Sequence, residues 1–304
     1  PCSVAGTAAG TGPGDTIYDL CLASGVPAAA IGTFTQANVQ IEGLFGGNPN
    51  LEQEESDTFT IGAVIQPLDS LDITIDYFDI SVEDAISVLG GSVSNNLDIC
   101  YNQVQDLNST FCQAVTRRGD GNVDVVNVLN ENIGYIETKG IDLAINWVMD
   151  MDAGIGGDGS TFAVNLRSTF LDTYDIQPVQ DLPTVNKCAG TFGNTSGFCG
   201  RPRPEELYNT RVTWSTGPLT LSMLWRYMSK TEVDYLANDP STSPSDFSTP
   251  YTDAQNYVDL SAAWQFSDAF RLNVGVKNLF DEQPNFLGDE QNEANSYPAH
   301  FDII

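Results

Sequence analysis

The chain has 304 residues, and its 41 aspartates and glutamates against 12 lysines and arginines give a net charge of -29 at pH 7. Such an acidic surface repels phosphate backbones and argues against nucleic-acid binding; it fits a solvated exterior or a mouth that concentrates cationic or metal-bearing solutes. The sequence has no apolar run of about eighteen residues, which excludes a helical membrane span but not a β-barrel, whose strands are too short and polar to register on hydropathy.

Strict alternation of apolar and polar residues predicts β-strands along most of the chain. The clearest stretch is Leu71–Tyr77, in which Leu, Ile, Ile and Tyr alternate with Asp, Thr and Asp. A helix would scatter these aspartates around its axis. The same period of two predicts strands, in chain order, within residues 58–66, 71–77, 141–147, 162–170, 208–214, 219–227, 257–266 and 270–276.

Short and long connections alternate between these strands. Turn residues occupy 67–70, 150–159, 215–218 and 267–269, whereas the segments 83–132, 172–204, 232–254 and 281–296 are long and rich in Pro, Asn, Asp and Ser. Within the first long segment, Gly119–Asn122 between two apolar runs predicts a hairpin turn. Short turns at one rim and long loops at the other are typical of an up-and-down barrel in an outer membrane, so we predict an all-β, antiparallel transmembrane barrel.

Six cysteines lie outside the tight turns, as three neighbouring pairs: Cys2 with Cys21, Cys100 with Cys112, and Cys188 with Cys199. Sequence alone does not fix their connectivity, but a bridge between neighbours would staple its loop by about 2–4 kcal/mol. The alternative, a metal site, lacks any CxxC or Cys/His spacing, and the only histidine is His300. Disulfides would place the long loops in an oxidising compartment.

No residue pattern indicates catalysis, since the sequence has no nucleophile elbow, no Walker loop and no Cys/His pairing. We therefore expect no enzyme, no metal and no cofactor. Aromatic residues near strand ends are expected to form a girdle at the lipid headgroups rather than to stack on a ligand: Tyr77, Trp147, Trp225, Tyr227, Trp264 and Phe266. Loop aromatics are ligand candidates, with packing inside a stapled loop as the alternative: Tyr101, Phe111, Phe192, Phe198, Tyr235, Phe247 and Tyr251.

Four segments resemble TonB-dependent outer-membrane receptors. Gly275–Pro284, followed by Asn295–Pro298, resembles the penultimate strand and last loop of that family. Gly47–Glu54 with Ser56–Gly62 resembles its "NPNL-x-x-E" motif before a barrel strand. Further matches are Asp76–Ile80 with Asp84–Ile86, for the strand that follows, and Glu137–Asp142, for a "T-x-G-hydrophobic-D" strand. The resemblance extends from residue 47 to the end.

The resemblance implies a barrel of about twenty-two strands around an N-terminal plug. No segment here resembles the plug or the TonB-contacting box, fewer than half of the strands are present, and the chain stops at Phe301–Ile304, before the aromatic-ended last strand. We therefore expect residues 1–304 to be the C-terminal part of such a barrel, about 8–10 strands, with the plug and N-terminal strands absent. An open arc with unpaired edges should not insert into lipid alone.

The resemblance further implies import of a scarce nutrient, such as an iron chelate, cobalamin or a saccharide, with energy from TonB, and with TonB, a plug and outer-membrane lipid as partners. The long loops would be extracellular. Polar side chains predicted on the inner face, Asp72, Asp76, Asp142 and Asn146, would line the substrate path or bond to the plug and solvent. The alternative function is a secreted or surface acidic β-protein that acts in carbohydrate binding or adhesion; it would bury Leu71, Ile73 and Ile75 against a second sheet.

Overall fold

The computed structural model describes residues 1–37, 40–155, 159–193, 199–285 and 287. These residues divide into two compact units. Unit 1 comprises residues 1–55, 82–135 and 177–184, and unit 2 comprises 56–81, 136–176 and 185–304. No helix among the described residues is long and apolar enough to cross a membrane.

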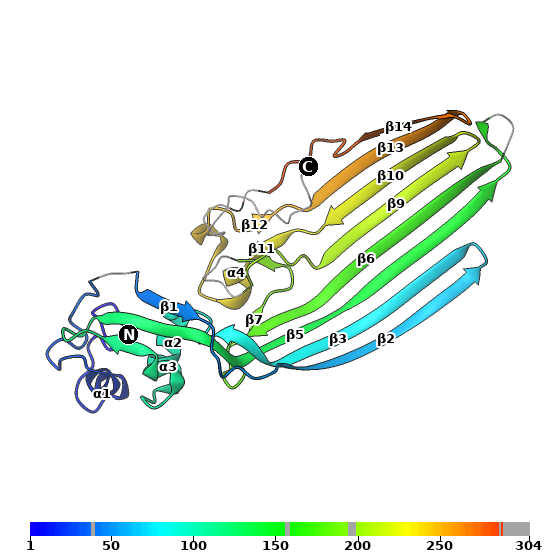
Figure 1. Ribbon diagram of the computed structural model, residues 1–304. Helices are drawn as coiled ribbons and strands as arrows, with labels where there is room; N and C mark the ends of the chain where they lie inside the picture. The colour runs from blue at the N-terminus through cyan, green and yellow to red at the C-terminus, as the bar shows by residue number, and fades with distance from the viewer. Residues whose placement is uncertain (38–39, 156–158, 194–198, 286, 288–304) are drawn as a thin grey trace. The chain divides into compact units, whose positions relative to one another are not determined.

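The wall of unit 2 is one antiparallel sheet in which sequence neighbours pair (Figure 1). Its strands follow the order β14-β13-β10-β9-β6-β5-β3-β2, so the described part is an open section of a barrel with β2 and β14 as its end strands. Their bounds are Glu55–Leu68 (β2), Leu71–Val88 (β3), Val123–Met151 (β5), Ser160–Gln177 (β6), Glu206–Thr216 (β9), Leu219–Met228 (β10), Gln255–Ser267 (β13) and Phe270–Val276 (β14).

Two-residue turns at 69–70, 217–218 and 268–269 join β2 to β3, β9 to β10 and β13 to β14. Gly217 has φ +48°, a left-handed conformation that a residue without Cβ adopts at little cost. The other ends of the strands carry the long connections, as the alternation of short and long segments predicts. All eight predicted strands are present in the sheet.

The register places apolar side chains on one face of the wall and polar side chains on the other. On β10 and β13, Leu221 pairs with Ala262 and Met223 with Leu260, whereas Ser222 pairs with Ser261. We call the side with Leu221 and Met223 the apolar face, and the side with Ser222 the polar face. Val274 on the apolar face of β14 is 55% exposed, so no protein layer covers it. A sandwich, the alternative architecture, would bury this side chain.

Unit 1 has its own apolar core. The core comprises residues from α1 (Thr16–Ala23), α2 (Val93–Asp98), the π-helix η1 (Ile99–Val104), α3 (Thr110–Gln113) and the first residues of β5. Each α-helix begins at a capping side chain: Asp15, Ser92 and Ser109 accept hydrogen bonds from backbone N–H groups of the first turns. β1 (Glu42–Gly46) pairs parallel with β5, and β4 (Val115–Arg117) pairs antiparallel with it.

The hairpin predicted around Gly119–Asn122 is formed by β4 and β5. In contrast, the segments 83–132 and 172–204 are not wholly loops, because β3 extends to Val88, β6 to Gln177, and β5 starts at Val123. The period of two fails in this part of β5 because unit 1 buries unevenly spaced side chains, Val123, Val126 and Val128. Alternation reveals only strands with one solvated or lipid-facing side.

The long connections of unit 2 fold together. The sheet β12-β11-β8 joins Thr191–Phe192 (β8), Thr231–Val233 (β11) and Tyr251–Thr252 (β12). A small core of Phe192, Val233 and Leu287 packs against residues of α4 (Asp234–Asn238) and Phe247, which follows the 3₁₀ turn η3 (Pro244–Asp246). β7 (Asn186–Lys187) pairs with the end of β6. These connections are therefore ordered structure at the ends of the wall strands that lie away from the two-residue turns.

Candidate functional site

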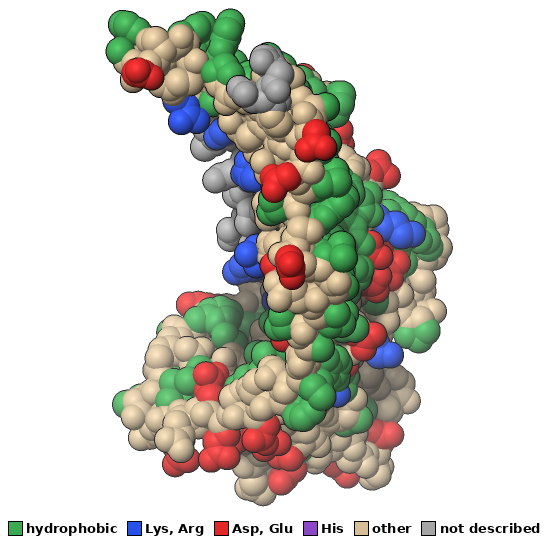
Figure 2. Space-filling model, turned by 90° about the vertical axis from the view of Figure 1, so that its right-hand side faces the viewer, with side chains coloured by type: hydrophobic (Ala, Val, Ile, Leu, Met, Phe, Trp, Pro, Cys, Tyr) green, Lys and Arg blue, Asp and Glu red, His purple; other side chains and the backbone are tan. Residues whose placement is uncertain are grey.

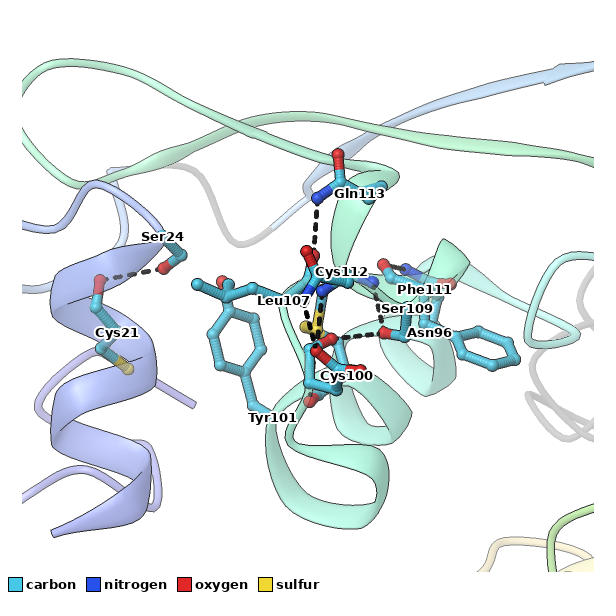
Figure 3. The surroundings of a disulfide bond; sticks show 12 residues. Cys21, Ser24, Asn96, Cys100, Tyr101, Leu107, Ser109, Phe111, Cys112 and Gln113 are labelled. Atoms are coloured by element: carbon cyan, nitrogen blue, oxygen red, sulfur yellow. Dashed lines mark hydrogen bonds between the residues drawn. A yellow bond between two sulfur atoms is a disulfide. The ribbon is translucent and has the colours of Figure 1, made fainter.

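Three disulfides join the cysteines that neighbour one another in sequence. Cys2 bonds to Cys21, Cys100 to Cys112, and Cys188 to Cys199. The surroundings of the second bridge are shown in Figure 3: Asn96 Nδ2 donates to the carbonyl of Phe111 at 2.9 Å, and Ser109 Oγ accepts from the amide of Cys112 at 3.3 Å. Local pairing was the economical prediction, and the structure forms it. Cys2–Cys21 and Cys100–Cys112 lie in unit 1, and Cys188–Cys199 lies in unit 2, in the connection between β6 and β9.

Two groups of aromatic rings bound the apolar face. Near the loop ends, Tyr208 stacks on Tyr227 with centroids 5.1 Å apart, and Trp225 lies 5.9 Å from Tyr227. Near the turns, Trp264 and Phe266 are 4.6 Å apart, and Trp147 lies 6.5 Å from Phe162. This arrangement matches the girdles that flank the lipid-facing band of a membrane barrel.

The distance between the two groups fits a bilayer. Phe162 lies near the turn end of β6, and Phe170, 5.7 Å from Tyr208, lies eight residue steps further along the strand. Eight steps correspond to about 26 Å of extended strand, or about 20 Å along the membrane normal at a tilt of about 40°. The lipid-facing band of outer-membrane barrels is about 25 Å tall.

The predicted lumen residues lie on β3 and β5, the strands that carry most of the aspartates of the polar face. Along the β5–β6 seam, Thr169 Oγ1 donates to Asp142 at 2.6 Å, Asn165 Nδ2 to Asn146 at 3.0 Å, and Thr161 Oγ1 to Asp150 at 2.9 Å. On β3, Asp72 accepts a bond of 2.9 Å from Gln66, and the carboxylate of Asp76 lies against Gly62. The four candidates thus lie on β3 and β5; Asp72, Asp142 and Asn146 are hydrogen-bonded to neighbouring strands, and Asp76 contacts Gly62 of β2.

The other side of the polar face carries arginines that the sequence analysis did not single out. Arg167, Arg211, Arg226 and Arg271 lie on β6, β9, β10 and β14. They lie on the polar face, because Arg211 pairs with Asn165 and Arg271 pairs with Gln265, which are residues of that face. Each arginine stands at a polar position of an alternating strand, so the sequence already indicates the face on which it lies. Which arginines are neighbours is visible only from the register between the strands.

Arg226 is neutralised on this face, and its partner anchors the segment that follows β14. Its guanidinium donates to both carboxylate oxygens of Asp259, at 3.1 and 3.2 Å. Asp259 also accepts a 2.8 Å bond from the amide of Asn278, and Gln255 Nε2 donates to the carbonyl of Gln283 at 3.2 Å. The Gly275–Pro284 motif is thereby fastened back onto β13.

Burial removes several loop aromatics from the candidate ligand surface. Phe192 is fully buried, Tyr101 is 1% exposed and Phe111 is 8% exposed, so these three pack inside their loops, which was the alternative considered for them. Tyr235 and Phe247 are half-buried and stack with centroids 6.1 Å apart. Phe198 lies outside the described residues. Tyr251 is 48% exposed and remains able to contact a solute.

Tyr251 lines a pocket of about 520 Å³ in unit 2. The pocket also includes Tyr227, Lys230, Glu232 and Asp253, at the loop ends of β10 and β13. Its charged and aromatic lining suits a polar solute better than lipid. Among the described residues, no three His, Cys, Asp or Glu side chains are placed to share a metal ion.

Local hydrogen bonds perturb titratable groups in the hairpin of unit 1. The backbone amide of Asn122 donates to Asp120 at 2.9 Å, which lowers the pKa of that carboxyl. The neighbouring Arg118 donates to Asp124 at 2.7 Å, which raises the pKa of its guanidinium. Both groups lie at the surface, so they order the turn and do not indicate a reactive site.

Comparison with known proteins gives a family match over most of the chain. A family model described as "TonB dependent receptor-like, beta-barrel" matches residues 18–279. No curated protein matches the chain.

Solved receptors align with a low TM-score. The ferric enterobactin receptor of Pseudomonas aeruginosa is 16% identical, with 80% of this chain and 28% of that chain covered and a TM-score of 0.49. The pyoverdine outer membrane receptor of P. aeruginosa PAO1 is 17% identical, with 77% of this chain and 27% of that chain covered and a TM-score of 0.42. The FrpB iron transporter of Neisseria meningitidis is 14% identical, with 78% of this chain and 28% of that chain covered and a TM-score of 0.42. The chain thus spans under a third of the length of these proteins.

Proposed function

This chain belongs to the TonB-dependent receptor β-barrel family, and we propose that it forms part of an outer-membrane receptor that imports a scarce nutrient. The nutrient binds at the long loops and passes along the polar face when energy is delivered by TonB. Residues 1–304 form the C-terminal part of the barrel, and the remaining strands and the plug belong to the parent protein. The family is one of receptors and not of enzymes.

The observation that carries the proposal is the two-sided wall. Its apolar face is exposed between two groups of aromatic rings, which fits contact with lipid, and its polar face bears charged residues, which fits a water-filled lumen. A secreted adhesive or carbohydrate-binding module would have no use for so much uncovered apolar surface, because exposed patches of this kind cause aggregation in water.

The disulfides support an orientation with the long loops outside the cell. Two of the bridges fall in long connections between wall strands, Cys100–Cys112 between β3 and β5 and Cys188–Cys199 between β6 and β9, and disulfides persist in oxidising surroundings. Short turns on the periplasmic side and longer extracellular loops are the general pattern of outer-membrane barrels. The pocket beside Tyr251 would then face the cell exterior, where a solute arrives.

The test uses the full receptor, produced in a Gram-negative host with TonB present or deleted. The solute that co-purifies with the receptor is identified by mass spectrometry, and its uptake is then measured with a radiolabel. We expect uptake that requires both the receptor and TonB. Uptake that is unchanged without TonB, or a receptor that fractionates with soluble proteins, would contradict the proposal.

A further inference from the structure

Arg167 and Arg211 occupy diagonal positions on the polar face of β6 and β9. Asn165 pairs with Arg211, and Arg167 pairs with Asn209, so the Cα atoms of the two arginines are about 7–8 Å apart. Both side chains are exposed. Two guanidinium groups at this spacing repel each other unless an anion lies between them.

Neither arginine forms an ion pair with any of the described residues. Within the described ranges, the ion pairs join Arg118 to Asp124, Lys139 to Asp79 and Glu137, and Arg226 to Asp259. Arg167, Arg211 and Arg271 take part in none of them. In a chain with a net charge of -29, three arginines without an acidic partner on one face are a strong departure from the average charge.

Hydrogen bonds order the wall around this arginine pair. Arg211 Nη1 donates to Ser222 Oγ at 3.2 Å, and Ser222 Oγ lies 3.3 Å from Thr213 Oγ1. This bond engages one nitrogen of the guanidinium group, and the other N–H groups of Arg211 remain donors. Asn165, next to both arginines in register, is fixed by its 3.0 Å bond to Asn146. The pair therefore projects from a hydrogen-bonded patch of wall and not from a loop.

Charge is divided across the polar face. The β3 and β5 side carries Asp72, Asp76, Asp142 and Asp150, whereas the side from β6 to β14 carries Arg167, Arg211, Arg226 and Arg271 together with Asp259 and, at the loop end of β6, Asp175. Figure 2 shows Lys and Arg side chains spaced down one border of the face in view. An anion in the lumen would be repelled from the first side and attracted to the second.

We propose that Arg167 and Arg211 form an oxyanion site on the transport path, with Arg271 as the next contact toward the turns. Guanidinium groups bind carboxylates and phosphates through paired, charge-assisted hydrogen bonds. The inference rests on the proposed import function and adds the substrate class: the solute carries carboxylate or similar oxyanion groups. A neutral saccharide could accept hydrogen bonds from these arginines but would lack the attraction between opposite charges.

The test measures binding of radiolabelled citrate, a tricarboxylate probe, and of inorganic phosphate to the full receptor by equilibrium dialysis at low salt. Arg167→Gln and Arg211→Gln should each weaken citrate binding about tenfold or more, the loss of a hydrogen bond between charged groups. Arg211→Lys should keep part of the affinity, because it keeps the charge without the planar fork. Arg118→Gln is the matched control, since it removes the same charge from the turn of unit 1 and should leave the affinity unchanged.

Three results of the binding experiment would overturn the inference. They are no saturable binding of either anion to the unmodified receptor, an equal loss in the Arg118→Gln control, or variants that lower the stability of the receptor while anion binding persists. The last result would mean that the arginines hold another segment of the receptor. TonB-dependent uptake of a neutral solute would also refute the inference while the proposed function stands; uptake independent of TonB refutes the proposed function instead.

Discussion

Replacing Ala262 by arginine should destabilise the receptor, whereas the same change at its neighbour Ala263 should not. Ala262 lies on the apolar face, between Leu221 and Val274, and Ala263 lies on the polar face, paired with Thr220. Both substitutions replace alanine by arginine on the same strand, β13. The difference in the free energy of unfolding therefore measures which face meets lipid.

The expected magnitude follows from depth. Ala262 is two residues from Trp264, which is about 5 Å inside the girdle at a strand tilt of about 40°. Arginine costs about 2–4 kcal/mol at the bilayer midplane and about 0–1 kcal/mol at the interface, so we expect about 1–3 kcal/mol for Ala262→Arg. Leu260→Arg, two residues deeper, should cost about 2–4 kcal/mol, and Ala263→Arg less than about 1 kcal/mol.

The assay is urea unfolding of the full receptor in lipid vesicles, followed by tryptophan fluorescence. Retained folding of each variant is checked by resistance to detergent on unheated gels. Equal losses for Ala262→Arg and Ala263→Arg would refute the assignment of the two faces. A larger loss at position 262 than at 260 would refute the depth argument.

Three further outcomes are expected. Replacing both Cys100 and Cys112 by alanine should lower the stability of unit 1 by about 3 kcal/mol, the entropy of a short closed loop, and should appear as faster proteolysis of residues 89–122; unchanged cleavage would contradict it. Asp259→Asn should weaken the contact to Arg226 by about 1–2 kcal/mol, and hydrogen exchange in residues 278–285 should accelerate while β9 is unaffected. Because the pKa of Asp120 is lowered in the folded state, this carboxylate stabilises the hairpin above about pH 4, and the stabilisation is lost on acidification below that value. The amide resonance of Asn122, which donates to Asp120, should therefore titrate below about pH 4. Asp120→Asn should abolish that titration.

The wall was predictable from sequence because each strand has one lipid-facing and one water-facing side. That asymmetry places apolar residues at every second position, as in Leu219–Tyr227, and turn residues mark where each strand reverses. Unit 1 has no such asymmetry. Its helices are short, the first residues of β5 are buried unevenly, and its core depends on contacts between residues 1–37 and 93–128 that no local pattern encodes.

The candidate site was predictable only in part. Asp72, Asp76, Asp142 and Asn146 were found because alternation places each on the polar side of its own strand. The arginine pair is not predictable in this way, because residues 167 and 211 are brought together by the register between β6 and β9. Tyr101 and Phe192 were ambiguous for the opposite reason: a loop aromatic reads the same whether it is buried or exposed.

The central claim, that the two faces of the wall meet lipid and water, is tested most directly by nitroxide scanning of β3. Single spin labels are placed at successive positions from 71 to 77 in the full receptor in lipid vesicles, and their collision rates with oxygen and with a water-soluble nickel chelate are measured. We predict that Leu71, Ile73 and Ile75 are accessible to oxygen, and that Asp72, Thr74 and Asp76 are accessible to nickel. Labels at the odd positions that are shielded from both reagents would indicate burial against a second sheet and would contradict the account.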